Sequence, residues 1–447
     1  MKIWLTLLCL LSIVPERMMA GPREGALIRD AEVEDIMRSF ANPIFKAAKL
    51  NPKSMSLYVV NSSEVNAFAT SGSIVVFYSG LLMRATSALQ VIGVLAHETA
   101  HVANHHSMLG MEAYKQAVLQ NLLGTLGGIA LGAMNPEAGA AILMGSQDMI
   151  LRGLLKFSRT QEGSADQGAV RYLDSLGWSS DGLLEFLNIL HHGDILVACE
   201  QHIDPYLMTH PLLTERFDFL KSHIAKSPYT KAAFPQKFEE DFRRLQVKLR
   251  AFTDPPLRTL ANFPATDQSL LGRYARAIAH LQNAQPEDSL KEIESLLRDY
   301  PKDPFFWDLK GQILFESGKI KEAASAYEKA VALRPDIPLL SVTLAHALIE
   351  SNDLEKAFPL LARATIDEPD NALVHRLLAI YYGKKDKTGL AALSLAEMAF
   401  QTGDLKQATQ QAKRAMHFLK GDAVNLTRAK DLLDEVERAE KPASGPF

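Results

Sequence analysis

The second half of the chain repeats a pattern of small and large residues every 34 positions, and this period limits the folds open to it. One unit carries the pattern at Trp307, Gly311, Leu314, Ala323, Tyr327, Ala330 and Pro335. The next unit carries it at Ser341, Ala345, Leu348, Ala357, Leu361, Ala364 and Pro369. Small residues recur where two paired helices would touch, large residues where they would interlock, and proline where a helix must stop. Stacked helical hairpins fit this pattern, because each hairpin buries its apolar face against its neighbours.

This period is the length of a tetratricopeptide repeat. A weaker unit ends at Pro301, one period before the first clean unit ends, and a degenerate one follows with Ala408, Ala412 and Ala415. We therefore expect an α-solenoid of tetratricopeptide repeats over residues 268–440. Such arrays expose a concave surface that binds peptides or partner proteins, and a helical spacer without a ligand is the alternative.

The 447 residues of the chain are too many for one ordinary domain. Three prolines and several turn formers lie between positions 252 and 267, and they predict a linker over residues 256–267. The residues before it, 27–255, combine helical patterns with two short β-rich segments. We expect a mostly α protein, whose mainly helical first domain contains a small β-sheet.

The amino terminus has the pattern of a secretory signal. Lys2 precedes an apolar run from Ile3 to Val14, and Ala20 offers a cleavage point. This run is too short to span a bilayer as a mature helix. We expect residues 1–20 to be a signal peptide, and an uncleaved anchor is the alternative.

Charge and a second apolar segment constrain the partners. The formal net charge is −4, which argues against nucleic acid as the main partner. Residues 116–150 are almost uncharged and rich in glycine, leucine and alanine. They favour a buried helix pair or a mobile lid, and the alternatives are a membrane hairpin and a peripheral contact with a membrane.

The chemistry of the first domain centres on the sequence His97-Glu98-Thr99-Ala100-His101. Residues four apart lie on one face of a helix, so both imidazoles can reach the same ion. Zinc accepts neutral imidazole nitrogens, and a catalytic zinc site keeps one position open for water. Glu98 would stand beside that water as the catalytic base, taking its proton and returning it to the leaving amine. A surface helix with two solvated histidines is the alternative.

A third metal ligand is needed. Some metallopeptidases place it as a histidine six residues after the motif, but Ser107 stands there. His105 and His106 lie further round and along the helix, and we expect both to be structural or to contact a ligand.

Glu162 is the better candidate for the third ligand, since it lies far enough along the chain to return on another helix. Asp166 follows one helical turn later on the same face. There it can accept the second N–H of a zinc-bound histidine and fix the orientation of its ring. An ordinary polar helix face is the alternative for both residues.

These motifs, with Thr209-His210-Pro211 and Arg216, resemble the HtpX-like zinc metallopeptidases. With a signal peptide before them and tetratricopeptide repeats after them, the whole chain resembles the BepA-type family of periplasmic proteases and chaperones of Gram-negative bacteria. The resemblance implies a mainly helical zincin domain that holds one zinc ion per chain. It also implies that the ligands are His97, His101 and Glu162 and that the base is Glu98.

The resemblance implies further roles around the metal. His210 would occupy the fourth zinc position and hold the enzyme inactive until its loop moves. The alternatives are that it stabilises the transition state or that it is a loop histidine without a catalytic role. Arg216 would stabilise an oxyanion or pair with a carboxylate. The strand from Gly72 to Gly80 would be the edge strand beside the metal, where a substrate adds as another strand through Gly72, Ile74 and Val76. A core strand without substrate is the alternative.

From the same resemblance we expect a periplasmic endopeptidase, associated with the outer membrane, that degrades misassembled outer-membrane β-barrel proteins and assists their assembly. The repeats would dock it on the β-barrel assembly machinery. One alternative is a chaperone or adaptor with latent protease activity. The other is an integral-membrane quality-control protease that uses residues 116–150.

Overall fold

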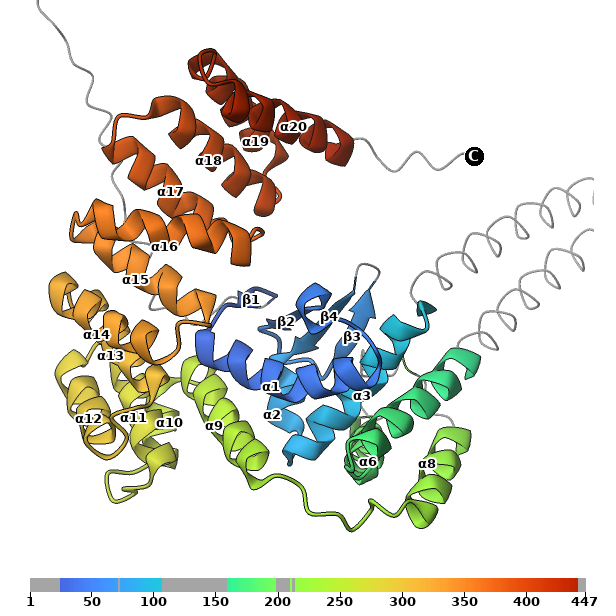
Figure 1. Cartoon of the computed structure of the whole chain (residues 1–447). Helices are drawn as coiled ribbons and strands as arrows, with labels where there is room; N and C mark the ends of the chain where they lie inside the picture. Colours follow the sequence, from blue (N-terminus) through green and yellow to red (C-terminus); the bar gives the residue numbers. More distant parts are fainter. Residues whose placement is uncertain (1–24, 71–72, 107–158, 198–209, 211–213, 441–447) are drawn as a thin grey trace, which may run out of the picture. The chain divides into compact units, whose positions relative to one another are not determined.

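The computed structural model describes residues 25–70, 73–106, 159–197, 210 and 214–440 (Figure 1). The expected signal peptide and the apolar segment 116–150 lie outside these residues. The chain divides into two compact units. The first comprises the residues up to Arg29 together with Val33–Pro255, and the second comprises Asp30–Glu32 and the residues from Pro256 onward. Among the described helices, none has both the length and the apolar character needed to cross a membrane.

The first unit contains a four-stranded sheet of order β1-β2-β4-β3 (Figure 1). Its strands are β1 (Leu27–Ile28), β2 (Ser56–Val60), β3 (Ala67–Thr70) and β4 (Ile74–Tyr78). β4 pairs in parallel with β2 and antiparallel with β3. The expectation that strand 72–80 forms the edge of the sheet is therefore wrong, and β3 is the edge next to it.

The sequence of β4 explains its central place. Val75, Val76 and Phe77 are buried in succession, so both faces of the strand are covered. Helix α1 (Ala31–Ala47) contributes Met37 and Phe40 to the same apolar core. Further described helices of this unit include the short η1 (Pro52–Ser54) and α2 (Ser79–Arg84) and the longer α6 (Asp181–Val197), α8 (Thr214–Lys226) and α9 (Gln236–Thr253).

Helix α3 (Ala88–Ala103) carries the His-Glu-x-x-His motif through the middle of this core. The Ser87 side chain caps its amino terminus by accepting a hydrogen bond from the Gln90 backbone. Nearly every residue from Ala88 to Val102 is buried, as expected for a helix that is apolar on most of its surface. The motif is thus held in a fixed part of the fold.

Small residues let other helices approach α3 closely. A Cβ atom on Gly182 of α6 would lie 2.3 Å from the carbonyl oxygen of Leu89. In the helix over residues 159–175, a Cβ atom on Gly168 would lie 2.6 Å from the Cβ of Ala100. Because Ala100 lies inside the motif, the second of its two variable positions is in direct contact with the helix that carries Glu162.

The second unit consists of paired helices (Figure 1). They are α10 (Pro256–Asn262), α11 (Leu270–Gln282), α12 (Pro286–Asp299), α13 (Pro304–Glu316), α14 (Ile320–Leu333), α15 (Pro338–Glu350), α16 (Leu354–Asp367), α17 (Ala372–Lys384), α18 (Thr388–Gln401), α19 (Leu405–Phe418) and α20 (Ala423–Glu440). α10 occupies much of the segment expected as a linker. The expectation of a mostly α protein with a small sheet and a series of helical hairpins is confirmed.

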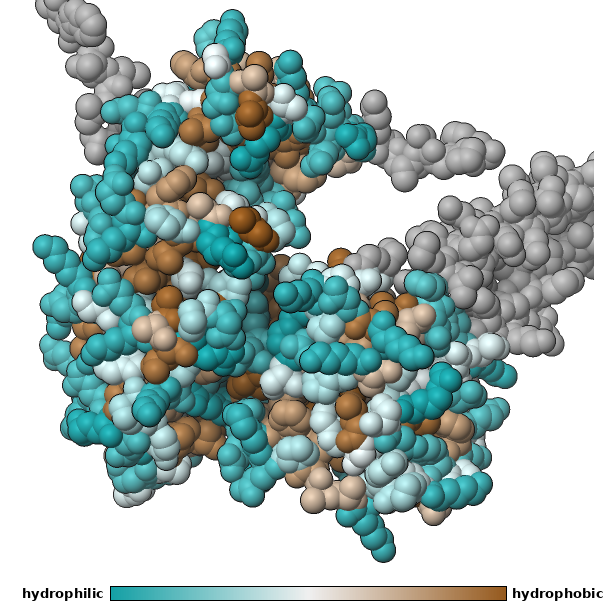
Figure 2. Space-filling view, viewed as in Figure 1, coloured by the Kyte–Doolittle hydropathy of each residue, from teal (hydrophilic) through white to brown (hydrophobic). Residues whose placement is uncertain are grey.

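Packing inside the hairpins explains the repeated residues. A Cβ atom on Gly311 would lie 2.6 Å from the ring of Tyr327, so a small residue faces a large one within the pair α13 and α14. The surface of this unit is mixed, with brown apolar residues among hydrophilic ones in Figure 2. Its exposed large apolar side chains include Leu257, Ile366, Phe418 and Val424.

The crossing of α3 and α6 can be tested by adding one methyl group. We expect Gly182→Ala to lower the free energy of unfolding by about 1–3 kcal/mol, because the methyl would meet backbone atoms that cannot move aside. Gly163→Ala is the matched control, since nothing lies within 4 Å of its added Cβ. Urea denaturation should rank Gly163→Ala at or above wild type, and equal losses in the two variants would contradict the close crossing.

Candidate metal centre

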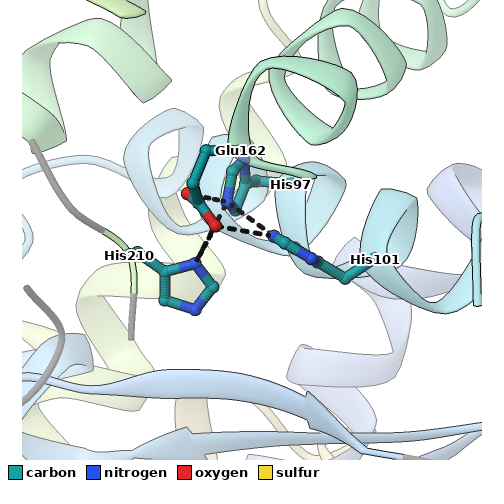
Figure 3. A group of neighbouring side chains, drawn as sticks. All are labelled: His97, His101, Glu162 and His210. Atoms are coloured by element: carbon teal, nitrogen blue, oxygen red, sulfur yellow. Dashed lines mark hydrogen bonds and ion pairs between the residues drawn. The ribbon is translucent and has the colours of Figure 1, made fainter. Parts of the chain in front are cut away.

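Four side chains from three segments converge in the first unit (Figure 3). His97 and His101 project from α3, and their Nε2 atoms lie 3.1 Å apart. Glu162, from the helix over residues 159–175, places Oε2 3.3 Å from His97 Nε2 and Oε1 3.4 Å from His101 Nε2. His210 completes the group, with Nδ1 3.0 Å from Glu162 Oε1 and 3.4 Å from His97 Nε2.

These spacings fit a tetrahedral metal site. Zinc bonds of about 2.0–2.1 Å place neighbouring donor atoms of a tetrahedron roughly 3.3–3.4 Å apart. Five of the six pairs of side chains have donor atoms 3.0–3.4 Å apart, and one donor atom from each of the four side chains lies within 4.8 Å of all the others. Imidazole nitrogens and a carboxylate are also a donor set that suits a divalent transition metal. The residues therefore fit such an ion.

The protonation of these groups agrees with ligand roles. Burial lowers the pKa of His101 to about 3, which leaves the neutral imidazole that a metal requires. Burial disfavours the charged form of Glu162, but hydrogen bonds from the three histidines outweigh it and hold its pKa well below the usual range. Burial would also lower the pKa of His97, but contacts with Asp166 and Glu162 raise it to about 9, and a metal would replace that proton.

Asp166 lies behind His97, one turn after Glu162 on the same helix. Its Oδ1 is 2.9 Å from His97 Nδ1, so it can accept the ring proton that points away from the cluster. Both groups are fully buried. This contact leaves Nε2 of His97 facing the other three donors, which is the orientation needed for metal binding.

Arg216 of α8 joins the two carboxylates of this helix. Its Nε and Nη2 atoms donate to Asp166 at 2.8 and 2.9 Å, and its Nη1 lies 2.9 Å from Glu162 Oε2. The side chain of Arg216 is 2% exposed, so these ion pairs are shielded from water. The arrangement agrees with the carboxylate-pairing role and leaves the oxyanion role without a structural observation to support it.

Glu98 is fully buried beside the cluster. Neither of its carboxylate oxygens has a hydrogen-bond partner among the described residues, and Oε1 lies 3.5 Å from His210 Nε2. Burial raises the pKa of this carboxyl group, and that makes it a stronger base. An unsatisfied buried carboxylate next to a metal cluster is suited to accepting a proton from water.

The structure changes the expectations for the substrate strand and for His105 and His106. Ile74 and Val76 lie in the central strand β4, whose two edges are already paired, and Gly72 lies outside the described residues. His105 and His106 differ from each other, although the same role is expected for both. His105 is exposed, whereas His106 is buried and places Nδ1 2.9 Å from Nδ1 of His101. The position of His106 depends on a backbone turn that residue spacing does not reveal.

The Arg216 network can be tested separately from activity. We expect Arg216→Met to lower the free energy of unfolding by about 3–5 kcal/mol, because two buried carboxylates would lose their charged partner. Arg171→Met is the control, since Arg171 is exposed on the helix of Asp166 and donates to the Gln167 carbonyl. The measurement is urea denaturation with a chelator present, and equal small losses would contradict the role given to Arg216.

Comparisons with known proteins agree with this geometry. Residues 27–224 match the model of peptidase family M48, and residues 274–338 and 314–381 match tetratricopeptide repeat models. The "Beta-barrel assembly-enhancing protease" of Yersinia pestis is 24% identical over 417 residues, covering 92% of this chain and 85% of the relative. The protein of that name in Escherichia coli (strain K12) is 24% identical over 93% of this chain and 85% of its own.

A third relative covers a smaller share of the chain. "Protease HtpX" of Legionella pneumophila (strain Corby) is 30% identical over 165 residues, which are 33% of this chain and 56% of that protein. The match to the peptidase model covers the described metal cluster, and the matches to the repeat models lie in the helical hairpins. The chain combines a peptidase family M48 domain with tetratricopeptide repeats, and it is a metalloprotease.

Proposed function

We propose that this chain is a zinc endopeptidase of the bacterial periplasm that degrades misassembled outer-membrane β-barrel proteins. The observation that carries the catalytic part is the buried set His97, His101 and Glu162 beside the unsatisfied carboxylate of Glu98. The substrate and the compartment are supported by the relatives named "Beta-barrel assembly-enhancing protease" and by the apolar run near the amino terminus.

The three ligands and Glu98 divide the work of peptide hydrolysis. Bound zinc would polarise the scissile carbonyl and lower the pKa of the attacking water. Glu98 takes the proton of that water and returns it to the nitrogen of the leaving amine. Asp166 and Arg216 hold His97 and Glu162 in place while this happens. The low polarity of the buried site strengthens each of these electrostatic interactions.

The substrate would bind along β3 rather than β4. β3 is the edge of the sheet that is paired only with β4 among the described strands, and it packs against α3. An extended polypeptide can add to such an edge through main-chain hydrogen bonds, with little dependence on its side chains. That mode suits unfolded substrates of many sequences.

The repeats would supply protein partners. A series of helical hairpins presents a surface for peptides or folded proteins, and we propose the β-barrel assembly machinery as its partner. The same proposal places the enzyme at the outer membrane, with a peripheral contact through residues 116–150. The formal net charge of −4 gives no support for nucleic acid as a ligand.

The catalytic assignment is tested with Glu98→Gln. The amide keeps the shape of the side chain but cannot accept the proton, so we expect zinc content to stay at that of wild type. Cleavage of an unfolded barrel protein should fall by about a hundredfold or more. Wild type treated with a chelator is the control for metal-dependent activity, and cleavage by Glu98→Gln at the wild-type rate would rule out this mechanism.

A latent form of the enzyme is favoured by the place of His210. Its Nδ1 completes the set of four donor atoms, and its Nε2 lies 3.5 Å from Glu98. A fourth protein ligand would remove the position that water needs. The resting enzyme would then be closed, and the repeats could bind partners without proteolysis.

His210→Ala separates this closed form from a catalytic role. We expect cleavage of substrate or of the enzyme itself to rise, about tenfold for each 1.4 kcal/mol by which the closed site is favoured. The double variant with Glu98→Gln is the control, and it should stay inactive. A fall in cleavage with His210→Ala would support transition-state stabilisation and exclude the latch.

A further inference from the structure

His106 lies directly behind one of the metal ligands. Helix α3 ends at Ala103, and the next turn brings the His106 ring against that of His101. The two ring centroids are 4.8 Å apart in an edge-to-face arrangement, and the two Nδ1 atoms are 2.9 Å apart. A hydrogen bond therefore joins the two rings through the nitrogens that point away from the cluster.

The direction of this hydrogen bond follows from the cluster. His101 directs Nε2 at His97 and Glu162, at 3.1 and 3.4 Å. A neutral imidazole that offers the lone pair of Nε2 to a metal carries its proton on Nδ1. That proton points at Nδ1 of His106, which must then act as the acceptor and carry its own proton on Nε2.

We propose that His106 is a positioning residue, which accepts the Nδ1 proton of His101 and so keeps Nε2 of His101 facing the metal. The inference rests on the proposed metal site. It gives each histidine of the motif its own partner, because Asp166 serves His97 in the same way. Partners of this kind orient the ligand ring and strengthen metal binding.

Two features hold His106 in this place. The backbone at His105 adopts a left-handed conformation with φ 54°, which is uncommon for a residue other than glycine and turns the chain back toward His101. The side-chain amide of Gln161 donates to the carbonyl oxygen of His106 at 3.0 Å. Because Gln161 precedes Glu162, this bond ties the partner of one ligand to the helix that carries another.

The negative charge already buried around the cluster explains why a neutral side chain, His106, is a suitable acceptor behind His101. Glu98, Glu162 and Asp166 are already buried around the cluster, and Arg216 is the cation that pairs with two of them. Another carboxylate behind His101 would add a further buried negative charge, which is costly without a partner. Histidine accepts the proton without that cost.

The test compares three replacements of His106 in the full chain. Asparagine places an acceptor oxygen near the position of Nδ1, glutamine places its oxygen near Nε2 instead, and leucine has no acceptor. We expect zinc affinity, measured on metal-free protein by competition with a chromophoric chelator, to stay near wild type in His106→Asn. It should fall about 10–100-fold in His106→Leu and His106→Gln.

His105→Gly serves as the matched control, because it keeps the turn, relieves the left-handed backbone and leaves the acceptor intact. Its zinc affinity should equal that of wild type. The Asn–Gln contrast decides the matter should His106→Leu fail to fold. Equal affinity in the Asn and Gln variants would overturn the proposal. Absence of zinc uptake by the wild-type chain would overturn the proposed function and this inference together, whereas uptake unaffected by His106→Gln would overturn this inference alone.

Discussion

The ion pairs of Arg216 with Asp166 and Glu162 are the interaction on which the rest of the centre depends. Three carboxylates are buried within one small region, and Arg216 supplies one positive charge to it. A divalent ion that displaces the extra proton of His97 would add two positive charges, so the three carboxylates, Arg216 and the ion would together be neutral. Burying unpaired charge is expensive, and the fold therefore favours the metal-bound form. The same buried charges therefore affect both the stability of the fold and its affinity for the metal.

Close packing of the helices positions the side chains that carry these charges. α3 runs through the apolar core. Glycine lets helix α6 approach the backbone of α3, and lets the helix of Glu162 approach the Ala100 side chain. Gly168 meets Ala100 between the two motif histidines, so the third ligand is set by a contact inside the motif itself. The ligand positions thus follow from helix packing, and the hydrogen bonds of Asp166 and His106 then set the orientation of each ring.

Much of the fold could be predicted because it depends on residues that recur at regular spacings along the sequence. The spacing of His97 and His101 on one helix face, and the repeated small residues in the second half, reflect helix geometry that sequence shows directly. The central position of β4 in the sheet was harder to predict from the sequence. Its run of apolar residues signals a strand covered on both faces, but strand order depends on pairing between distant segments. Likewise the partners of Arg216 and the inward turn of His106 are set by tertiary packing and by one left-handed residue.

The distribution of the centre along the chain has a consequence for when the enzyme becomes active. Glu98 and two ligands lie within five residues, whereas Glu162 follows His101 after 61 positions and Arg216 comes later still. These distant segments meet only through tertiary packing of the core. A chain that is still folding carries the motif without the remaining ligand and its charged partner. The complete metal centre is therefore a property of the folded unit, and the motif segment alone does not contain it.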